Sequence, residues 1–273
     1  MNLLVTCDEN YLAPLRVMLY SAFAQSPDTV FDVYLMHSSI PDEKTESLRR
    51  FVEKSGSRLH ALRVPEDAFS DAPTLKHFTK EMYYRLLAFQ LLPENMEKIL
   101  YLDPDILIIN PLDDLYQTDV SDWLFAAAHH NYGPIRDLNR VRLDAYEMPR
   151  YYNSGVLLMN LKRQREEIRE EDIFNYIREK KDVLVLPDQD VLNALYSHRI
   201  HSLPEVICNY ETRFHHMYGL SSKGEIDLDF VIKNTVVLHF CGKRKPWHPN
   251  YIGKFHALYR HYAHLADRYA NRA

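Results

Sequence analysis

The chain has 273 residues, of which 46% are hydrophobic and 26% charged, a balance typical of a folded globular protein. No apolar segment approaches the roughly 18 residues of a membrane-spanning helix, and the amino terminus lacks a signal-peptide pattern, so we expect neither membrane spanning nor secretion. The formal net charge is −5, yet residues 240–273 contain seven Lys or Arg and one Asp, which argues against a general nucleic-acid binder and leaves room for a local anion site.

The first 102 residues alternate between strand and helix patterns. Strands are predicted over Asn2–Cys7, Phe31–His37, Arg58–Val64 and Lys98–Leu102, and helices over Tyr11–Ala24, Asp42–Lys54 and Lys80–Leu92. This order predicts an α/β fold with a mostly parallel central sheet and helices on both faces.

The alternation is weaker beyond residue 110. Further strands are predicted over Trp123–Ala128, Gly155–Leu161 and Val236–Phe240, and helices over Glu166–Lys180 and Asp190–Tyr196. The stretch up to Arg150 has loop-like composition, and its charged part, Arg136–Arg150, is a candidate mobile lid. Because no Gly/Ser-rich linker is present, we expect a single domain.

An Asp-Pro-Asp sequence follows the predicted strand Lys98–Leu102. Asp103 and Asp105 project to the same side of an extended chain and can therefore converge on one cation. Ligand sites in open α/β sheets lie at the carboxyl ends of strands, whereas a plain polar turn would not need the apolar residues 106–109 after it. Two functions compete, namely a divalent metal that bridges a substrate diphosphate and a phosphohydrolase pair in which Asp103 is the nucleophile. The first is favoured because the pair ends the fourth strand rather than the first.

A second constellation follows the last predicted strand. His239 interrupts an apolar run, and Gly242 and three basic residues, Lys243–Lys245, follow it. A lone histidine on a strand is usually a core residue, and a charge run is usually a solvated surface. Together with glycine, however, these residues suit the close approach of an anion, with Lys245 as a point charge.

The order of the motifs along residues 1–250 resembles that of family 8 glycosyltransferases, which include bacterial lipopolysaccharide galactosyl- and glucosyltransferases and, more remotely, glycogenin. Six motifs carry the resemblance: Thr6–Tyr11 (TCDENY), Tyr83–Leu86 (YYRL), Tyr101–Asp105 (YLDPD, the DxD element), Tyr152–Leu161 (YNSGVLLMNL), Pro187–Asn193 (PDQDVLN) and His239–Trp247 (HFCGKRKPW). The resemblance implies a GT-A fold.

The resemblance also implies a set of site residues. Asp103, Asp105 and His239 would bind Mn²⁺, with Mg²⁺ as the alternative, and two carboxylates with one imidazole suit such an ion. The implied contacts with a UDP-sugar donor come from Thr6, Asp8, Asn10, Tyr11, Arg85, Asp103, Pro104, Asn153, Ser154, Asp188, Gln189, Gly242 and Lys245.

The implied reaction is transfer of glucose or galactose from UDP-glucose or UDP-galactose to a hydroxyl of a glycan or lipopolysaccharide-type acceptor, with retention at the anomeric carbon. Gln189 and Asp190 are the candidate catalytic residues, and we favour front-face attack by the acceptor over a covalent intermediate on Asp190. The alternatives are the metal-dependent phosphohydrolase and a catalytically silent relative that binds nucleotide-sugars.

The acceptor side and the end of the chain carry weaker signals. His77 is a tentative acceptor contact. We expect a glycosyltransferase domain over residues 1–250 and an aromatic and basic helical tail over 251–273, which docks on the body or, alternatively, contacts an anionic membrane. Three separated cysteines, Cys7, Cys208 and Cys241, form no disulfide framework, so we expect a cytoplasmic protein, with peripheral attachment to the inner face of the membrane as the alternative.

Overall fold

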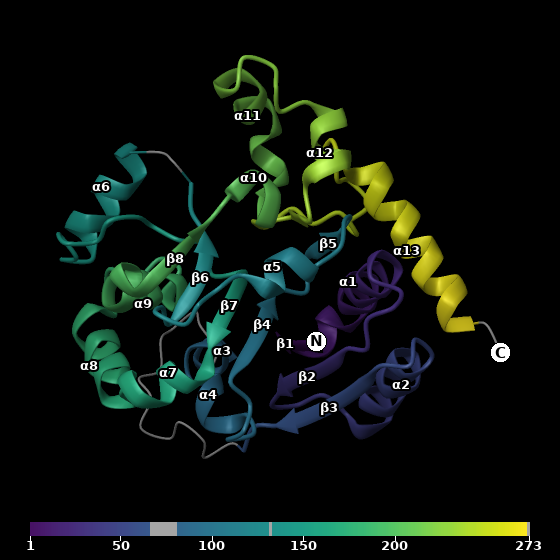
Figure 1. Ribbon diagram of the computed structural model, residues 1–273, viewed down its shortest axis with the longest axis horizontal. Coiled ribbons are helices and arrows are strands. Elements are labelled where there is room, and N and C mark those ends of the chain that lie inside the picture. The colour runs from purple at the N-terminus through teal and green to yellow at the C-terminus, as the bar shows by residue number, and fades with distance from the viewer. Residues whose placement is uncertain (66–80, 131–132, 272–273) are drawn as a thin grey trace.

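A computed structural model describes residues 1–65, 81–130 and 133–271 of the chain (Figure 1). His77 and the beginning of the predicted helix Lys80–Leu92 lie outside these residues. No described helix is long and apolar enough to cross a membrane.

The main sheet has seven strands in the order β3-β2-β1-β4-β7-β6-β8. Their bounds are β1 Asn2–Thr6, β2 Asp32–His37, β3 Arg58–Arg63, β4 Lys98–Leu102, β6 Phe125–Ala128, β7 Val156–Asn160 and β8 Ile200–Leu203. Strand β7 is antiparallel to both of its neighbours, and all other pairings are parallel. The mostly parallel sheet predicted from the sequence is therefore confirmed.

The apolar residues of β1 alternate between two cores, as expected for a strand that is covered on both faces. Leu3 and Val5 belong to the core that includes α1 (Leu12–Gln25) and α2 (Asp42–Glu53). Leu4 lies in the other core, with Tyr83 and Phe174 from helices on the opposite face. Helices thus cover both faces of the sheet.

A second, three-stranded sheet has the order β5-β10-β9, with β5 at Ile106–Ile108, β9 at Tyr210–Glu211 and β10 at Val237–His239. The late strand expected at Val236–Phe240 exists, but it pairs antiparallel with β5 instead of extending the main sheet. Since β5 begins just after Asp105, this small sheet holds the DxD segment against the histidine segment.

Two predicted helices are each divided in the structure. The region predicted as Lys80–Leu92 forms α3 (Glu81–Leu86) and α4 (Ala88–Leu91), because Leu87 leaves the helical conformation at φ −116° and ψ 16°. The region predicted as Glu166–Lys180 contains the last two residues of α7 (Leu161–Glu167) and the whole of α8 (Glu170–Lys180), and the buried Ile168 between them is extended at φ −89° and ψ 129°.

The stretch expected to be loop-rich contains α6 (Gly133–Arg142), so that expectation is wrong. Its apolar side chains Leu138 and Val141 are 68% and 63% exposed, so neither of them joins the hydrophobic core. The remaining helices are α5 Asp113–Gln117, α9 Pro187–Tyr196, α10 Glu205–Cys208, α11 His215–Ser221, α12 Leu228–Asn234 and the 3₁₀ turns η1 Glu9–Tyr11, η2 Ser197–Arg199 and η3 Thr212–Phe214.

The last helix, α13 (His256–Asn271), lies alongside α1 (Figure 1). Tyr259 is buried, and the hydroxyl of Tyr262 accepts a hydrogen bond of 2.7 Å from Nε2 of Gln25. Nζ of Lys54 donates to the carbonyl of Ala270 at 2.7 Å. The docked helix agrees with the favoured interpretation of the tail, while the division of the chain at residue 250 stays a prediction.

Candidate active site

The candidate site lies where β4 ends and the antiparallel β7 begins. Leu102 pairs with Val156, and the backbone N–H of Asp103 donates to the carbonyl of Gly155 at 2.8 Å. The reversed direction of β7 therefore brings the segment Asn153–Gly155 to the same edge of the sheet as the DxD segment.

Asp103, Asp105 and His239 converge at this edge. Nε2 of His239 lies 3.2 Å from Oδ1 of Asp105 and 3.8 Å from Oδ2 of Asp103, and one ligand atom from each residue lies within 4.8 Å of the other two. The second sheet positions the histidine, because His239 pairs with Ile106 and the N–H of Phe240 donates to the carbonyl of Asp105 at 3.0 Å. Two carboxylates and an imidazole are ligands that suit a divalent first-row metal ion.

Gly155 makes room for this cluster. A Cβ atom at this position would lie 2.2 Å from Cε1 of His239 and 2.7 Å from Oδ2 of Asp103. No side chain fits at these distances, so the glycine is needed for the imidazole and the carboxylate to approach each other. The segment that supplies it belongs to the YNSG motif.

Asp105 and His239 are both buried, and each shifts the pKa of the other. Burial raises the pKa of Asp105, but His239 and Lys245 outweigh it and hold that pKa well below its usual range. Burial lowers the pKa of His239, but Cys241 and Asp105 outweigh it and raise that pKa well above its ordinary value. Nζ of Lys245 bonds to Oδ2 of Asp105, which leaves Oδ1 facing His239.

Arg85, on α3, joins the DxD segment to the start of α9. Its guanidinium lies 2.9 Å from Oδ1 of Asp103 and 2.9 Å from Oδ2 of Asp188, and it stacks over the ring of Tyr101 at 4.6 Å. Burial lowers the pKa of Arg85, but the charges of Asp103 and Asp188 outweigh it and raise that pKa. The hydroxyl of Tyr101 donates to Oδ1 of Asp103 at 2.6 Å and so fixes the orientation of the carboxylate.

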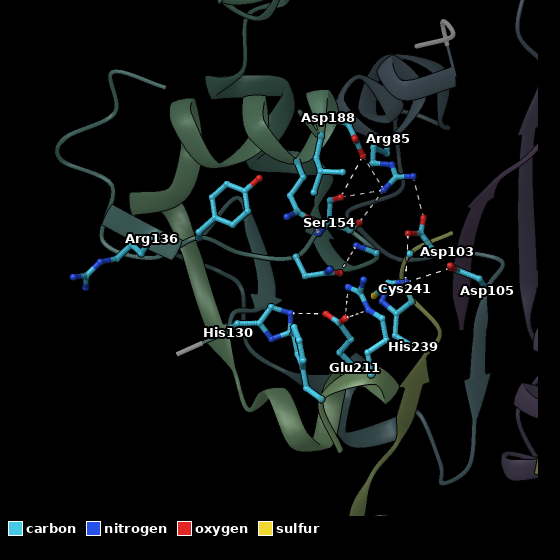
Figure 2. A pocket seen from close by; sticks show the side chains of 18 residues that line it. Arg85, Asp103, Asp105, His130, Arg136, Ser154, Asp188, Glu211, His239 and Cys241 are labelled. Atoms are coloured by element: carbon cyan, nitrogen blue, oxygen red, sulfur yellow. Dashed lines mark hydrogen bonds and ion pairs between the residues drawn. The ribbon is translucent and has the colours of Figure 1, made fainter. Parts of the chain in front are cut away.

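These residues surround a cavity of about 460 Å³ (Figure 2). Figure 2 shows Arg85, Ser154 and Asp188 on one side of it and His130 and Glu211 on the other. Nine of the residues expected from the sequence line it: Arg85, Asp103, Asp105, Asn153, Ser154, Asp188, Gln189, His239 and Gly242. Gln189 is oriented by its side-chain oxygen, which accepts from the N–H of Ser154 at 3.1 Å.

The other expected donor contacts, Thr6, Asp8, Asn10, Tyr11, Pro104 and Lys245, do not line this cavity. The carboxylate of Asp8 caps the turn η1 by accepting from the N–H groups of Asn10 and Tyr11, at 2.9 and 3.3 Å. Tyr11 meets the ring of Trp247 edge-on at a centroid distance of 5.7 Å, which places this turn beside the His239–Trp247 segment. Asp8 and Asn10 are exposed at the carboxyl end of β1, where a ligand can reach them.

Asp190 is fully buried and does not itself line the cavity, although its partners Tyr151 and Leu186 do. Its oxygens accept from Arg142 at 2.6 and 2.8 Å, from the hydroxyl of Tyr151 at 2.6 Å, and from the N–H groups of Val185 and Leu186 at 2.7 and 3.0 Å. Five donors therefore surround this carboxylate, and they fix the segment that leads into Asp188 and Gln189.

The structure adds residues that the sequence did not single out. Nδ1 of His239 lies 2.9 Å from Oδ1 of Asn209, and Nδ2 of Asn209 donates to Oδ1 of Asn153 at 2.9 Å, so Asn209 orients the imidazole. On the cavity wall opposite Arg85, Glu211 forms an ion pair with His130, at 2.8 Å, and another with Arg213. Asn209 and Glu211 lie in none of the six sequence motifs, whereas Tyr101 and Gly155 lie within two of them.

Comparisons with known proteins agree with this geometry. The family model described as "Glycosyl transferase family 8" matches residues 2–251. The lipopolysaccharide 1,2-glucosyltransferase of Escherichia coli K12 is 27% identical over 91% of this chain and 73% of its own length. General stress protein A of Bacillus subtilis is 25% identical over 96% of this chain and 92% of its own.

Among solved structures, the galactosyltransferase LgtC in complex with donor and acceptor sugar analogues superimposes with a TM-score of 0.80 at 24% identity, over 97% of this chain and 96% of that one. This likeness confirms the GT-A fold. Because the family model covers nearly the whole chain, the protein belongs to glycosyl transferase family 8.

Proposed function

We propose that this glycosyltransferase moves glucose or galactose from UDP-glucose or UDP-galactose to a hydroxyl of a glycan, with retention at the anomeric carbon. The observation that carries the proposal is the convergence of Asp103, Asp105 and His239 at the wall of the cavity. This cluster suits a cation that holds the diphosphate of a nucleotide-sugar.

The residues present fit Mn²⁺, with Mg²⁺ as the alternative, in both donor chemistry and shape. Oxygen and imidazole ligands match these ions, and Gly155 leaves the space that the three side chains need. When bound, the cation supplies positive charge that favours departure of the diphosphate. Asp105 keeps one oxygen for this purpose while Lys245 occupies the other.

We assign the donor contacts by their place around the site. Thr6, Asp8, Asn10 and Tyr11 follow β1 and would bind the nucleoside, with Pro104 beside them in the DxD segment. Gly242 and Lys245 would meet the diphosphate. Arg85, Asn153, Ser154, Asp188 and Gln189 would contact the transferred sugar, which is supported by their position on the cavity wall.

The proposed step is a front-face displacement. The bond between the anomeric carbon and the UDP oxygen breaks, a bond to the acceptor oxygen forms, and the acceptor proton passes to a phosphate oxygen of UDP. Gln189, oriented by Ser154, would lie beside the reacting carbon. Asp190 would act as a positioning residue, because its carboxylate accepts from five donors and does not line the cavity.

The acceptor is the least constrained part of the proposal. Lipopolysaccharide is the acceptor class suggested by the name of the E. coli relative, and it is consistent with a cytoplasmic enzyme at the inner face of a membrane. His77 remains a proposed acceptor contact. The docked α13 shows how the tail packs, and contact of its exposed side with a membrane is part of the proposal only.

The test is release of UDP from UDP-glucose and UDP-galactose in the presence of Mn²⁺, with Asp103→Ala as the inactive control. A donor present at 100 times its Kd should also stabilise the fold by about 2.7 kcal/mol in a thermal-shift panel. Release of phosphate from small phosphoesters without release of UDP would favour a phosphohydrolase. Donor binding without turnover toward any glycan would identify a silent relative.

A further inference from the structure

A second cavity, of about 430 Å³, lies next to the first and differs from it in charge. Of the described residues that line it, none is acidic and six are basic: Arg213, His215, His216, Lys243, Arg244 and Lys254. The two cavities share Arg213, Cys241 and Gly242 and are therefore neighbours along this segment.

The three basic residues after Gly242 point to two different sites. Lys245 is buried and turns inward to Asp105 and to the carbonyl of Phe240. Lys243 and Arg244 instead line the second cavity, and within the described chain neither they nor Lys254 have a carboxylate at ion-pair distance. No ion pair among the described residues therefore compensates their positive charge.

Two further features concern the basic side chains of this cavity, one of which, Arg213, is paired with Glu211. Gly242 adopts φ +89°, and a Cβ atom there would lie 2.8 Å from Nη1 of Arg213, so only glycine lets the guanidinium rest over the backbone between the cavities. Burial, followed by the charges of Lys254 and His216, lowers the pKa of His215. The charge of Lys254 therefore reaches His215 on the same cavity wall.

We propose that this second cavity binds a phosphate group carried by the saccharide acceptor. Arginine and lysine together match a phosphate, the arginine through its planar fork and the lysine as a point charge. The proposal rests on the proposed function, in which the diphosphate of the donor is already held by the DxD cluster and Lys245. A separate anion site beside Gly242 is then available to the other substrate.

The experiment uses the full chain saturated with UDP and Mn²⁺, after a thermal shift has verified that both bind. Calorimetric titrations compare glucose 6-phosphate, inorganic phosphate and glucose. The test variant is Lys243→Gln/Arg244→Gln/Lys254→Gln. The matched control, Lys162→Gln/Lys181→Gln/Lys233→Gln, removes the same charge from exposed positions outside this cavity.

We expect glucose 6-phosphate to bind at least as tightly as inorganic phosphate, and glucose at least tenfold more weakly. The test variant should lose at least tenfold in affinity for both phosphates while it keeps UDP and Mn²⁺, and the control should change less than twofold. Equal binding by the test variant, an equal loss in the control, or absence of phosphate binding would overturn the proposal. Tighter binding of inorganic phosphate would indicate a free-phosphate site instead.

One more arm separates a lipid from a saccharide. The full chain and the test variant are also mixed with phosphatidylglycerol vesicles. If the vesicles bind only when Lys243, Arg244 and Lys254 are present, and glucose 6-phosphate does not bind, the ligand of this cavity is a membrane headgroup and not a saccharide phosphate. If UDP and Mn²⁺ fail to bind at the outset, the proposed function fails, and the phosphate titrations on the protein alone still report on the cavity.

Discussion

Nε2 of His239 lies 3.2 Å from Oδ1 of Asp105, and Nδ1 of the same ring lies 2.9 Å from the side-chain oxygen of Asn209. The imidazole is thus held from both sides, by a residue that we assign to the cation and by a residue that orients the ring. Replacement of the ring itself should have a different effect from replacement of Asn209, which orients it.

We expect His239→Ala to abolish the stabilisation by Mn²⁺ with UDP, because one of the three proposed protein ligands is lost. Asn209→Ala keeps the ligand but frees the ring, so Mn²⁺ affinity should fall by roughly 10- to 100-fold. Titration of Mn²⁺ by calorimetry in the presence of UDP measures both. Unchanged affinity in His239→Ala would remove this residue from the metal site.

Gly155→Ala tests the crowding around the same cluster. Its methyl group would lie 2.2 Å from Cε1 of His239, so the imidazole must move and Mn²⁺ binding should be lost. Gly219→Ala in α11 is the matched control, since its nearest neighbour would lie at an ordinary 3.7 Å. We expect the control to bind Mn²⁺ normally, and the same result for Gly155→Ala would contradict the tight packing described here.

Replacement of Asp190 should act mainly on stability. Asp190→Asn leaves Arg142 without a counter-charge in a buried network, and the free energy of unfolding should fall by about 3 to 5 kcal/mol in urea titrations. Asp188→Asn is the comparison, and its loss should be smaller because Arg85 keeps Asp103. Incubation with a slow donor should yield no sugar attached to Asp190. A glycosyl adduct there, detected by mass spectrometry, would sink the front-face mechanism.

His130 gives the stability a pH dependence. Burial lowers the pKa of this residue, but its partners Glu205 and Glu211 outweigh it and raise the pKa to about 9. The folded chain therefore holds this proton more tightly than the unfolded chain, in which the pKa is about 6.5. The protonated His130 therefore adds roughly 3 kcal/mol to the free energy of unfolding, at 1.4 kcal/mol per pKa unit. This stabilisation is fully present below the pKa of the unfolded chain and is lost as the pH rises through the pKa of the folded chain.

Urea titrations between pH 6 and pH 10 check this expectation. His130→Gln should be less stable than the unaltered chain at pH 6, and the difference should shrink as the pH rises toward 9. A difference that stays constant over this range would show that the proton on His130 does not contribute. The comparison of the two proteins removes the effect of other titrating groups.

The sequence predicted the four strands of the first 102 residues to within one residue because their apolar patterns are local. β1 was expected at Asn2–Cys7 and is found at Asn2–Thr6, and β4 was expected and is found at Lys98–Leu102. The motifs likewise indicated most of the cavity wall. Signals of this kind lie within a few neighbouring residues and need no knowledge of the tertiary structure.

What the sequence could not predict depends on partners far along the chain. The carboxylate of Asp190 is buried against Arg142 of α6, which lies 48 residues earlier in the chain. The pairing of β10 with β5 likewise follows from the tertiary structure. The interruption at Leu87 and the orientation of His239 by Asn209 depend on packing in the same way.

The ladder between β5 and β10 has a consequence for how the protein tolerates length changes. Side chains on a strand alternate in direction, so a one-residue insertion between Val237 and His239 would turn the imidazole to the reverse face of the small sheet. Loops that border the cavity without contacting His239 can grow or shrink without moving the ring. Variation among functional descendants of this chain should therefore collect in those loops and spare the spacing of this short strand.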